Sequence, residues 1–81
     1  MSVAIQGIYD QLLKCKITEF ASTHFLSDTI GNPRSIACFL LVGGRFNSLQ
    51  LLKEEIKKCL SGFNVAIHEV NDGVLTITPI D

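Results

Sequence analysis

The chain lacks the surplus of positive charge that nucleic-acid-binding proteins carry. It has seven lysines and arginines against eight aspartates and glutamates, and its formal net charge is −1. A clustered positive field supplies most of the affinity of a protein for DNA or RNA. The balance of charge therefore excludes nucleic acid as an expected partner.

Long hydrophobic runs are also missing. No apolar stretch reaches the ~18–20 residues that are needed to cross a bilayer. The N-terminus does not show a basic segment followed by an apolar one, which is the pattern of a secretory signal. We therefore expect a cytoplasmic protein with no membrane contact.

The three cysteines lack the short paired spacings of a disulfide framework or a zinc site. Cys38 lies in an apolar run, and Cys15 and Cys59 fall on the apolar faces of predicted helices. Free cysteines in such places pack as small hydrophobic residues. The sequence predicts three free core cysteines, with no metal site and no cofactor.

The sequence shows no assembled set of catalytic residues. His24 and His68 have no Ser, Cys or carboxylate at a spacing that implies a site with them. Glu54 and Glu55 are adjacent in a predicted helix, so their side chains diverge around its axis. We expect a protein that is not an enzyme and has no catalytic residue.

Hydrophobic residues, in contrast, are abundant and make up 47% of the 81 positions. A chain of this length forms one domain, predicted over residues 1–81, and buries only about 60–65% of its unfolded surface. Small proteins rarely leave large apolar patches exposed. We therefore predict that part of the apolar surface contacts another protein or a second copy of the chain.

The segment from Ser35 to Val42 is the candidate for the central strand. Seven of its eight residues are apolar and there is no polar alternation, which is typical of an interior strand covered on both faces. Turn signals bound the segment, namely Pro33 before it and Gly43-Gly44 after it. We expect this strand to form the middle of a sheet.

Two amphipathic helices are predicted, one on each side of this strand in the sequence. The first runs from about Val3 to Cys15. The second has Asn47 as its N-cap, with Gln50 three residues later to complete a capping box, and ends at Ser61-Gly62. Their buried stripes are Ile5, Ile8, Leu12 and Cys15 in the first, and Leu49, Leu52, Ile56 and Cys59 in the second.

The segment from Lys16 to Leu26 is open to two interpretations. Its apolar residues can extend the first helix, but its serine and threonines are poor helix formers and suit a strand together with its phenylalanines. We favour a strand. The following stretch, residues 27–34, is predicted to be a loop because it contains Asp28, Gly31, Asn32 and Pro33.

The C-terminal stretch from Asn64 to Ile80 predicts a β-hairpin whose register depends on the length of its turn. A two-residue loop of Asp72-Gly73 would mix polar with apolar residues on each face, whereas a three-residue loop of Asn71-Asp72-Gly73 separates them. We predict the longer loop, with Gly73 left-handed. Val65, Ile67, Leu75 and Ile77 then share one face, and Ala66, His68, Thr76 and Thr78 share the other.

Together these elements predict an α+β fold, with a mostly antiparallel sheet of three to four strands and two helices packed on one face. The expected order is α-β-β-α-β-β, or α-β-α-β-β if the first helix is long. A shift of 44 residues lays the stripe of the first helix onto that of the second. That match favours the first order and is consistent with two related helix-strand-strand halves.

One candidate site is an anion-binding loop between the central strand and the second helix. Backbone N–H groups at a helix N-terminus can hold an anion, and an arginine adds further donors. The same glycines also fit an ordinary tight turn. The residues of this candidate site are Gly43, Gly44, Arg45, Asn47 and Ser48.

A second candidate site is the polar face of the C-terminal hairpin, formed by Ala66, His68, Thr76 and Thr78. This face is the predicted protein interface. The leading hypothesis is a non-enzymatic protein–protein interaction module, either a homodimer or a small subunit, adaptor or inhibitor that binds another protein. The alternative is a small-anion or nucleotide-binding domain that uses the loop of residues 43–48.

Overall fold

The computed structural model describes residues 3–41, 48–70 and 73–80 of the chain. They form the order helix, two strands, helix, two strands, which confirms the predicted α+β class and the first of the two predicted orders. The elements are α1 (Val3–Lys14), the 3-10 turn η1 (Ile17–Glu19), β1 (Ala21–Ser27), β2 (Pro33–Leu40), α2 (Leu49–Cys59), β3 (Val65–Val70) and β4 (Val74–Pro79).

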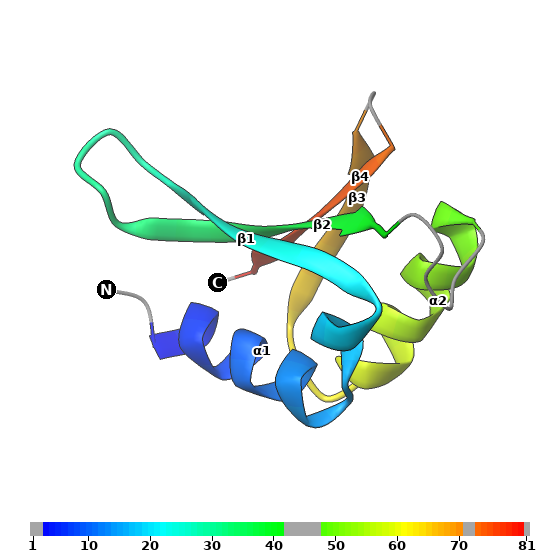
Figure 1. The fold of residues 1–81 in the computed structure, drawn as a ribbon. Helices are drawn as coiled ribbons and strands as arrows, with labels where there is room; N and C mark the ends of the chain where they lie inside the picture. Colours follow the sequence, from blue (N-terminus) through cyan, green and yellow to red (C-terminus); the bar gives the residue numbers. More distant parts are fainter. Residues whose placement is uncertain (1–2, 42–47, 71–72, 81) are drawn as a thin grey trace.

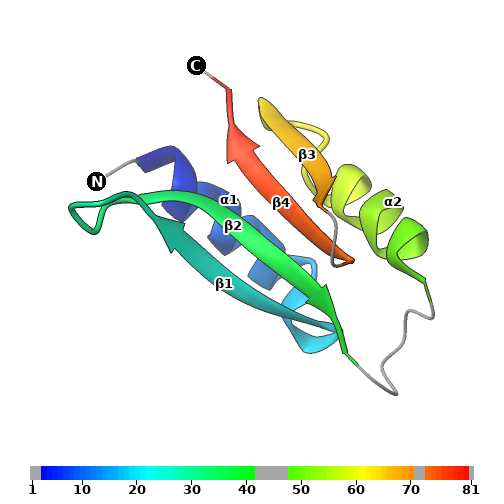
Figure 2. The same cartoon turned by 90° about the horizontal axis from the view of Figure 1, so that it is seen from above.

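The four strands form one antiparallel sheet in the order β1-β2-β4-β3. Both helices lie on the same face of this sheet, so the fold has two layers (Figure 1). Seen from above, the sheet lies in front of α1, and α2 lies beyond β3 (Figure 2). The predicted packing of two helices on one face is therefore confirmed, and β2 and β4 are the central strands.

The core lies between the helices and the sheet, and it is almost entirely aliphatic. The predicted helix stripes supply one side of it, because Ile8 and Leu12 of α1 and Leu52 and Ile56 of α2 are all buried. These four residues are the pairs that the 44-residue shift superposes. The sheet supplies the other side with Ala21, Ile36, Cys38, Leu75 and Ile77.

The segment between α1 and β1 combines features of both sequence interpretations. The helix ends at Lys14, and Lys16 adopts a left-handed conformation with φ of 62°. A short 3-10 turn follows, and the strand begins only at Ala21, about five residues later than predicted. Because the helix stops before Cys15, this cysteine is exposed, and its predicted place in the buried stripe is wrong.

The N-cap of α2 is Ser48 and not Asn47 as predicted. The hydroxyl oxygen of Ser48 accepts a hydrogen bond from the backbone N–H of Leu51 at 3.2 Å. Asn47 itself lies outside the described residues. Asn and Ser are about equally favoured as N-caps, so two candidates side by side do not fix the first residue of a helix.

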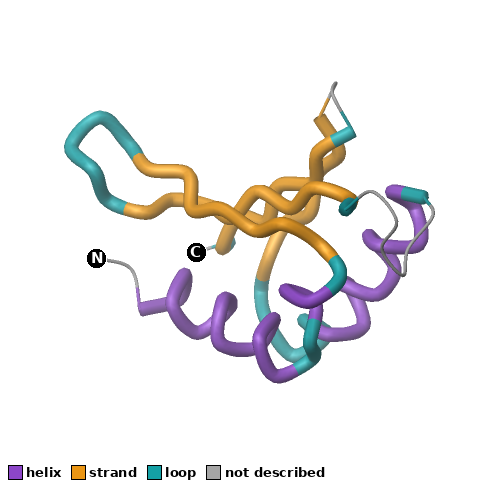
Figure 3. The backbone as a smooth tube through the Cα atoms, viewed as in Figure 1, coloured by secondary structure: helices purple, strands orange, loops and turns teal. Residues whose placement is uncertain are grey.

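The first hairpin is closed by a loop that Asp28 organises. Its Oδ1 accepts hydrogen bonds from the backbone N–H groups of Ile30 and Asn32, and its Oδ2 pairs with Arg34 at 3.0 Å. The hydrogen bond from Asn32, with those from Ile30 and Arg34, lowers the pKa of Asp28 despite partial desolvation. Figure 3 shows this hairpin projecting past the N-terminal end of α1.

The register of the second hairpin is as predicted. Ile67 lies opposite Ile77 and Glu69 opposite Leu75, and Gly73 has a φ of 73°. Asn71 and Asp72, the other two residues of the predicted loop, lie outside the described residues.

Replacing Gly73 by valine is expected to lower the free energy of unfolding by at least ~1 kcal/mol. An added Cβ at this position meets no atom within 4 Å, so the cost comes from the left-handed backbone and not from a clash. Urea denaturation of the variant measures this difference. A Gly73→Asn variant is the control, because asparagine tolerates this conformation better. An equal loss in both variants would contradict the backbone explanation.

One prediction about β2 is wrong. Its uninterrupted apolar run predicts cover on both faces, but the helices cover only one of them (Figure 1). Ile36 and Cys38 point into the core and are buried, whereas Phe39 is exposed on the opposite face. The composition of β2 is therefore that of a strand buried on both faces, but in this fold the helices cover only one of its faces.

Candidate functional site: the outer face of the sheet

The face of the sheet opposite the helices, called the outer face below, contains no Asp, Glu, Lys or Arg on its described strands. An uncovered face of an antiparallel sheet is normally polar. Depletion of charged residues is, in contrast, what distinguishes the centre of a protein interface from other surfaces. The outer face consists of Ser22, His24 and Leu26 of β1, Ser35, Ala37 and Phe39 of β2, Ala66, His68 and Val70 of β3, and Val74, Thr76 and Thr78 of β4.

These residues form rows that cross all four strands. One row, at the end of the sheet near α2, holds Ser22, Phe39, Val74 and Val70 as successive cross-strand neighbours. Two large apolar side chains of this row are exposed to solvent, Phe39 to 38% and Val70 to 43%. This end of the outer face is therefore its most hydrophobic part.

The next row has a histidine at each end and small residues between them. Successive neighbours in it are His24, Ala37, Thr76 and His68. Ala37 is only 3% exposed, although no described helix lies over it. The middle of this row thus carries small side chains, with one imidazole on each edge strand.

All four residues of the predicted interface lie on the outer face. They come from the two strands on one side of it, and the hydroxyl of Thr76 donates to the backbone oxygen of His68 at 3.5 Å. The sequence analysis did not include the first hairpin in this surface, although Phe39 and Leu26 are its largest side chains there. Alternation along β1 and β2 would have assigned these residues to the faces, but only the strand order shows that both hairpins share one outer surface.

The Ser22–His24 pair was also missed. The hydroxyl oxygen of Ser22 lies 2.8 Å from Nε2 of His24, because residues two apart in a strand point to the same face. The sequence analysis did not identify this pair, because it found no serine at a spacing that implies a site with a histidine. In a nucleophile–base pair a third group orients the imidazole. Here the ring of His24 instead meets that of Phe39 edge-on, with 5.5 Å between centroids.

The predicted anion-binding loop lies almost wholly outside the described residues. Gly43, Gly44, Arg45 and Asn47 are among the residues left out, and only Ser48 is described. Its hydroxyl oxygen caps α2, so it satisfies a backbone donor of the protein itself.

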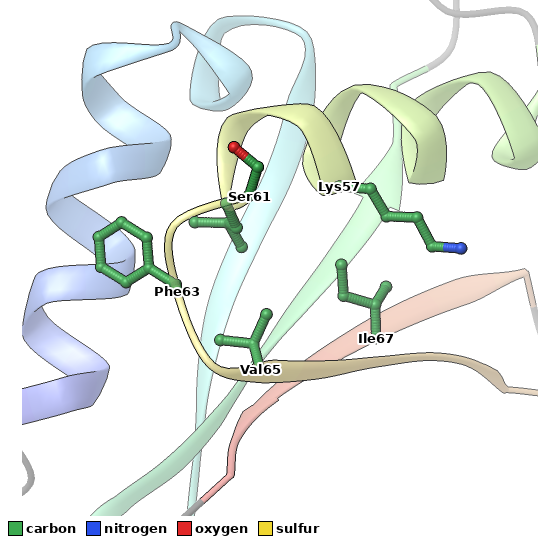
Figure 4. A pocket seen from close by; sticks show the side chains of 6 residues that line it. Lys57, Ser61, Phe63, Val65 and Ile67 are labelled. Carbon is green, nitrogen blue, oxygen red and sulfur yellow. The ribbon is translucent and has the colours of Figure 1, made fainter.

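A small pocket lies on the helix side of the molecule, between the end of α2 and β3 (Figure 4). Its volume is about 240 Å³, which is less than the 300–1,000 Å³ of typical small-molecule sites. The side chain of Phe63 is directed toward α1, where a Cβ on Gly7 would lie 3.9 Å from it. The lining residues are Lys57, Leu60, Ser61, Phe63, Val65 and Ile67.

Two of the cysteines lie together at the ends of the two helices. The side-chain amide of Gln11 donates to the Cys15 sulfur at 3.7 Å and to the Cys59 backbone oxygen at 3.2 Å. Desolvation raises the pKa of Cys59, and its hydrogen-bond and coulombic interactions with Cys15 raise it further. Cys38 stands apart in the core. Within the described ranges no three His, Cys, Asp or Glu side chains gather in a way that could hold a metal ion.

Comparisons with known proteins found no matching family model, no matching curated protein and no matching solved structure. Of the helices in the described part of the chain, none is both long and apolar enough to span a bilayer. We base the functional hypothesis on the outer face, because it is an uncovered sheet face whose described strands carry no charged residue there.

Proposed function

We propose that this protein is a non-enzymatic protein-interaction module that binds an uncharged, apolar surface of another protein through the outer face of its sheet. The observation that carries the proposal is an uncovered sheet face without a single Asp, Glu, Lys or Arg on its described strands. A partner with charged groups would lose their hydration on this surface without gaining an ion pair. An apolar partner surface would not have this cost.

The sequence of β2 supports the same conclusion. Its apolar residues continue through positions that point away from the helices, and Phe39 is the largest of them. Full burial of a side chain of this kind contributes about 1.5–3 kcal/mol, so removing the remaining exposed part contributes about 0.5–1 kcal/mol. Leu26 and Val70 are exposed to a similar extent, at 42% and 43%, and add comparable amounts.

Site-specific photo-crosslinking in the cells that make the protein tests this proposal. A photoreactive phenylalanine analogue at Phe39 is expected to crosslink to a partner protein. The same analogue at Leu51 of α2 is the matched control, because Leu51 is equally apolar and 46% exposed but lies on the helical layer. Crosslinks at both positions in equal yield would contradict a specific surface.

Binding to the purified crosslinked partner supplies the quantitative test. Phe39→Lys places a charge in the most hydrophobic row of the outer face and is expected to weaken binding by at least about tenfold, because the lysine would be buried without a partner. Leu51→Lys is expected to change the affinity less than about twofold. Equal affinity of the Phe39→Lys variant and the unchanged protein would reject the outer face as the binding surface.

A further inference from the structure

The free edge of β1 is a second surface that is suited to association. β1 pairs with β2 on one side only and is the edge strand of the sheet. Alternate residues of an edge strand direct their backbone N–H and C=O groups away from the sheet, where another strand can pair with them. Natural proteins protect such edges with charged side chains, proline or bulges.

β1 has little of this protection. Its seven residues, Ala-Ser-Thr-His-Phe-Leu-Ser, include no Asp, Glu, Lys, Arg or Pro, and its register shift comes only at Leu26 and Ser27, near the end of the strand. The opposite edge, β3, carries Glu69 in its exposed half. The 44-residue shift superposes Phe25 of β1 on Glu69 of β3. At corresponding positions, the β3 edge therefore has an acidic residue and the β1 edge has an aromatic residue.

Both faces of β1 expose a large apolar side chain beside this edge. Phe25 points to the helix side and Leu26 to the outer side, and each is 42% exposed. The ring of Tyr9 packs against that of Phe25, with 5.0 Å between centroids. Leu13, one turn further along α1 on the same side as Tyr9, is also exposed. A strand that pairs with this edge brings side chains to both faces and therefore covers Phe25 and Leu26 at the same time.

We propose that a second copy of this chain pairs with the free edge of β1, antiparallel and about a two-fold axis that passes beside Phe25. The two sheets then join into one continuous sheet of eight strands. Phe25 of each copy meets Phe25 of the other on the helix side, and His24 of each copy meets Leu26 of the other on the outer side.

The absence of charge favours a second β1 as the partner strand. A two-fold axis places identical residues opposite each other or at symmetric positions, and like charges directly opposite one another destabilise a strand pair. An uncharged strand avoids this repulsion. The same pairing at the β3 edge would bring two Glu69 carboxylates together, so self-association through β3 is disfavoured.

The size of the outer face gives a second reason for pairing. Four strands about 4.8 Å apart and about six residues long span roughly 19 Å by 20 Å, or about 400 Å² of flat sheet. Stable protein interfaces bury about 800 Å² of accessible surface on each partner. Edge-to-edge pairing places the outer faces of two copies on the same side of one continuous sheet and so doubles the flat area. The use of this enlarged surface rests on the proposed function, whereas the pairing itself rests on the edge of β1.

Light scattering of the purified protein and two charge variants tests the pairing. The unchanged protein is expected to have twice the mass of the 8.9 kDa chain at micromolar concentration. Phe25→Lys and Phe25→Glu each place like charges at the axis and are expected to raise the dissociation constant by at least about tenfold. Glu69→Lys is the matched control at the corresponding place on β3, and it is expected to remain dimeric.

Mixing the two Phe25 variants gives the sharpest outcome. Lysine from one copy then faces glutamate from the other, so a heterodimer is expected to form, which native mass spectrometry detects. A monomeric unchanged protein, or a Phe25→Lys variant that stays dimeric, would overturn the pairing. Dissociation by Phe39→Lys but not by Phe25→Lys would place the second copy on the outer face. The proposed function has its own test. It would be rejected if Phe39→Lys did not weaken binding to the partner protein, whatever the oligomeric state of the chain.

Discussion

Replacing Ile77 by alanine is expected to lower the free energy of unfolding by about 3–5 kcal/mol. Ile77 is fully buried on the central strand β4, with Ile36 of β2 and Ile67 of β3 as its cross-strand neighbours. Removing three carbon atoms there loses their transfer energy and leaves a cavity that strands on both sides hold open. Domains of this size have a total stability of only about 5–15 kcal/mol, so the variant is expected to be close to unfolding.

Two neighbouring substitutions serve as controls for the Ile77→Ala result. Ile67 is only partly buried and lies on the edge strand, so Ile67→Ala is expected to cost about 1–2 kcal/mol. His68 points to the outer face, and His68→Ala is expected to change the stability of the monomer by about 0.5 kcal/mol or less. Urea denaturation at one protein concentration measures all three variants. Equal losses at Ile77 and His68 would contradict the observed register.

The register of the C-terminal hairpin was predictable because two independent signals agree on it. Alternation separates Ile67 and Ile77 from His68 and Thr76 only in one register, and Gly73 supplies the left-handed residue which that register requires. The central position of β2 was predictable in the same way, from an apolar run between two turn signals. Local pattern and turn chemistry thus determine each strand pair within a hairpin.

The boundaries of the helices were harder to predict. Cys15 fits the apolar stripe of α1, but the left-handed Lys16 ends the helix first. Lysine has no special preference for this conformation, so no sequence signal marked the end. At the start of α2, Ser48 and Asn47 are equivalent candidates. Boundaries of this kind depend on the packing of the whole domain.

The outer face was only half predictable, and the reason is topological. Alternation in β3 and β4 identified Ala66, His68, Thr76 and Thr78 as one surface before the structure was known. Pairing of β2 with β4 makes Phe39 a neighbour of Val74, and these two residues are 35 positions apart in the sequence. Contacts of such separation are set by how the hairpins meet, which no local pattern specifies. The continuous apolar run of β2 predicted cover on both faces, whereas the helices cover only one of them.

Stability is expected to fall steeply above pH 9, and Cys38 is expected to account for much of the fall. The thiol is fully buried between β1 and β4, and desolvation raises its pKa from 9.0 to about 12. In the unfolded chain the thiol ionises near pH 9, whereas in the folded protein it stays protonated. The unfolded state therefore binds fewer protons between these two pKa values, and stability decreases as the pH rises through this window.

Comparison of the unchanged protein with a Cys38→Ala variant isolates this contribution. One thiol with these pKa values lowers the free energy of unfolding by about 2–3 kcal/mol between pH 8 and pH 11. Urea denaturation across this range, with reductant present, is expected to show a fall that is smaller by that amount in the variant. Because only the pH dependence is compared, the cost of the small cavity left by alanine cancels. Identical slopes would mean that water or a local opening reaches the Cys38 thiol in the folded state, and that the centre of the sheet is less tightly packed than its complete burial indicates.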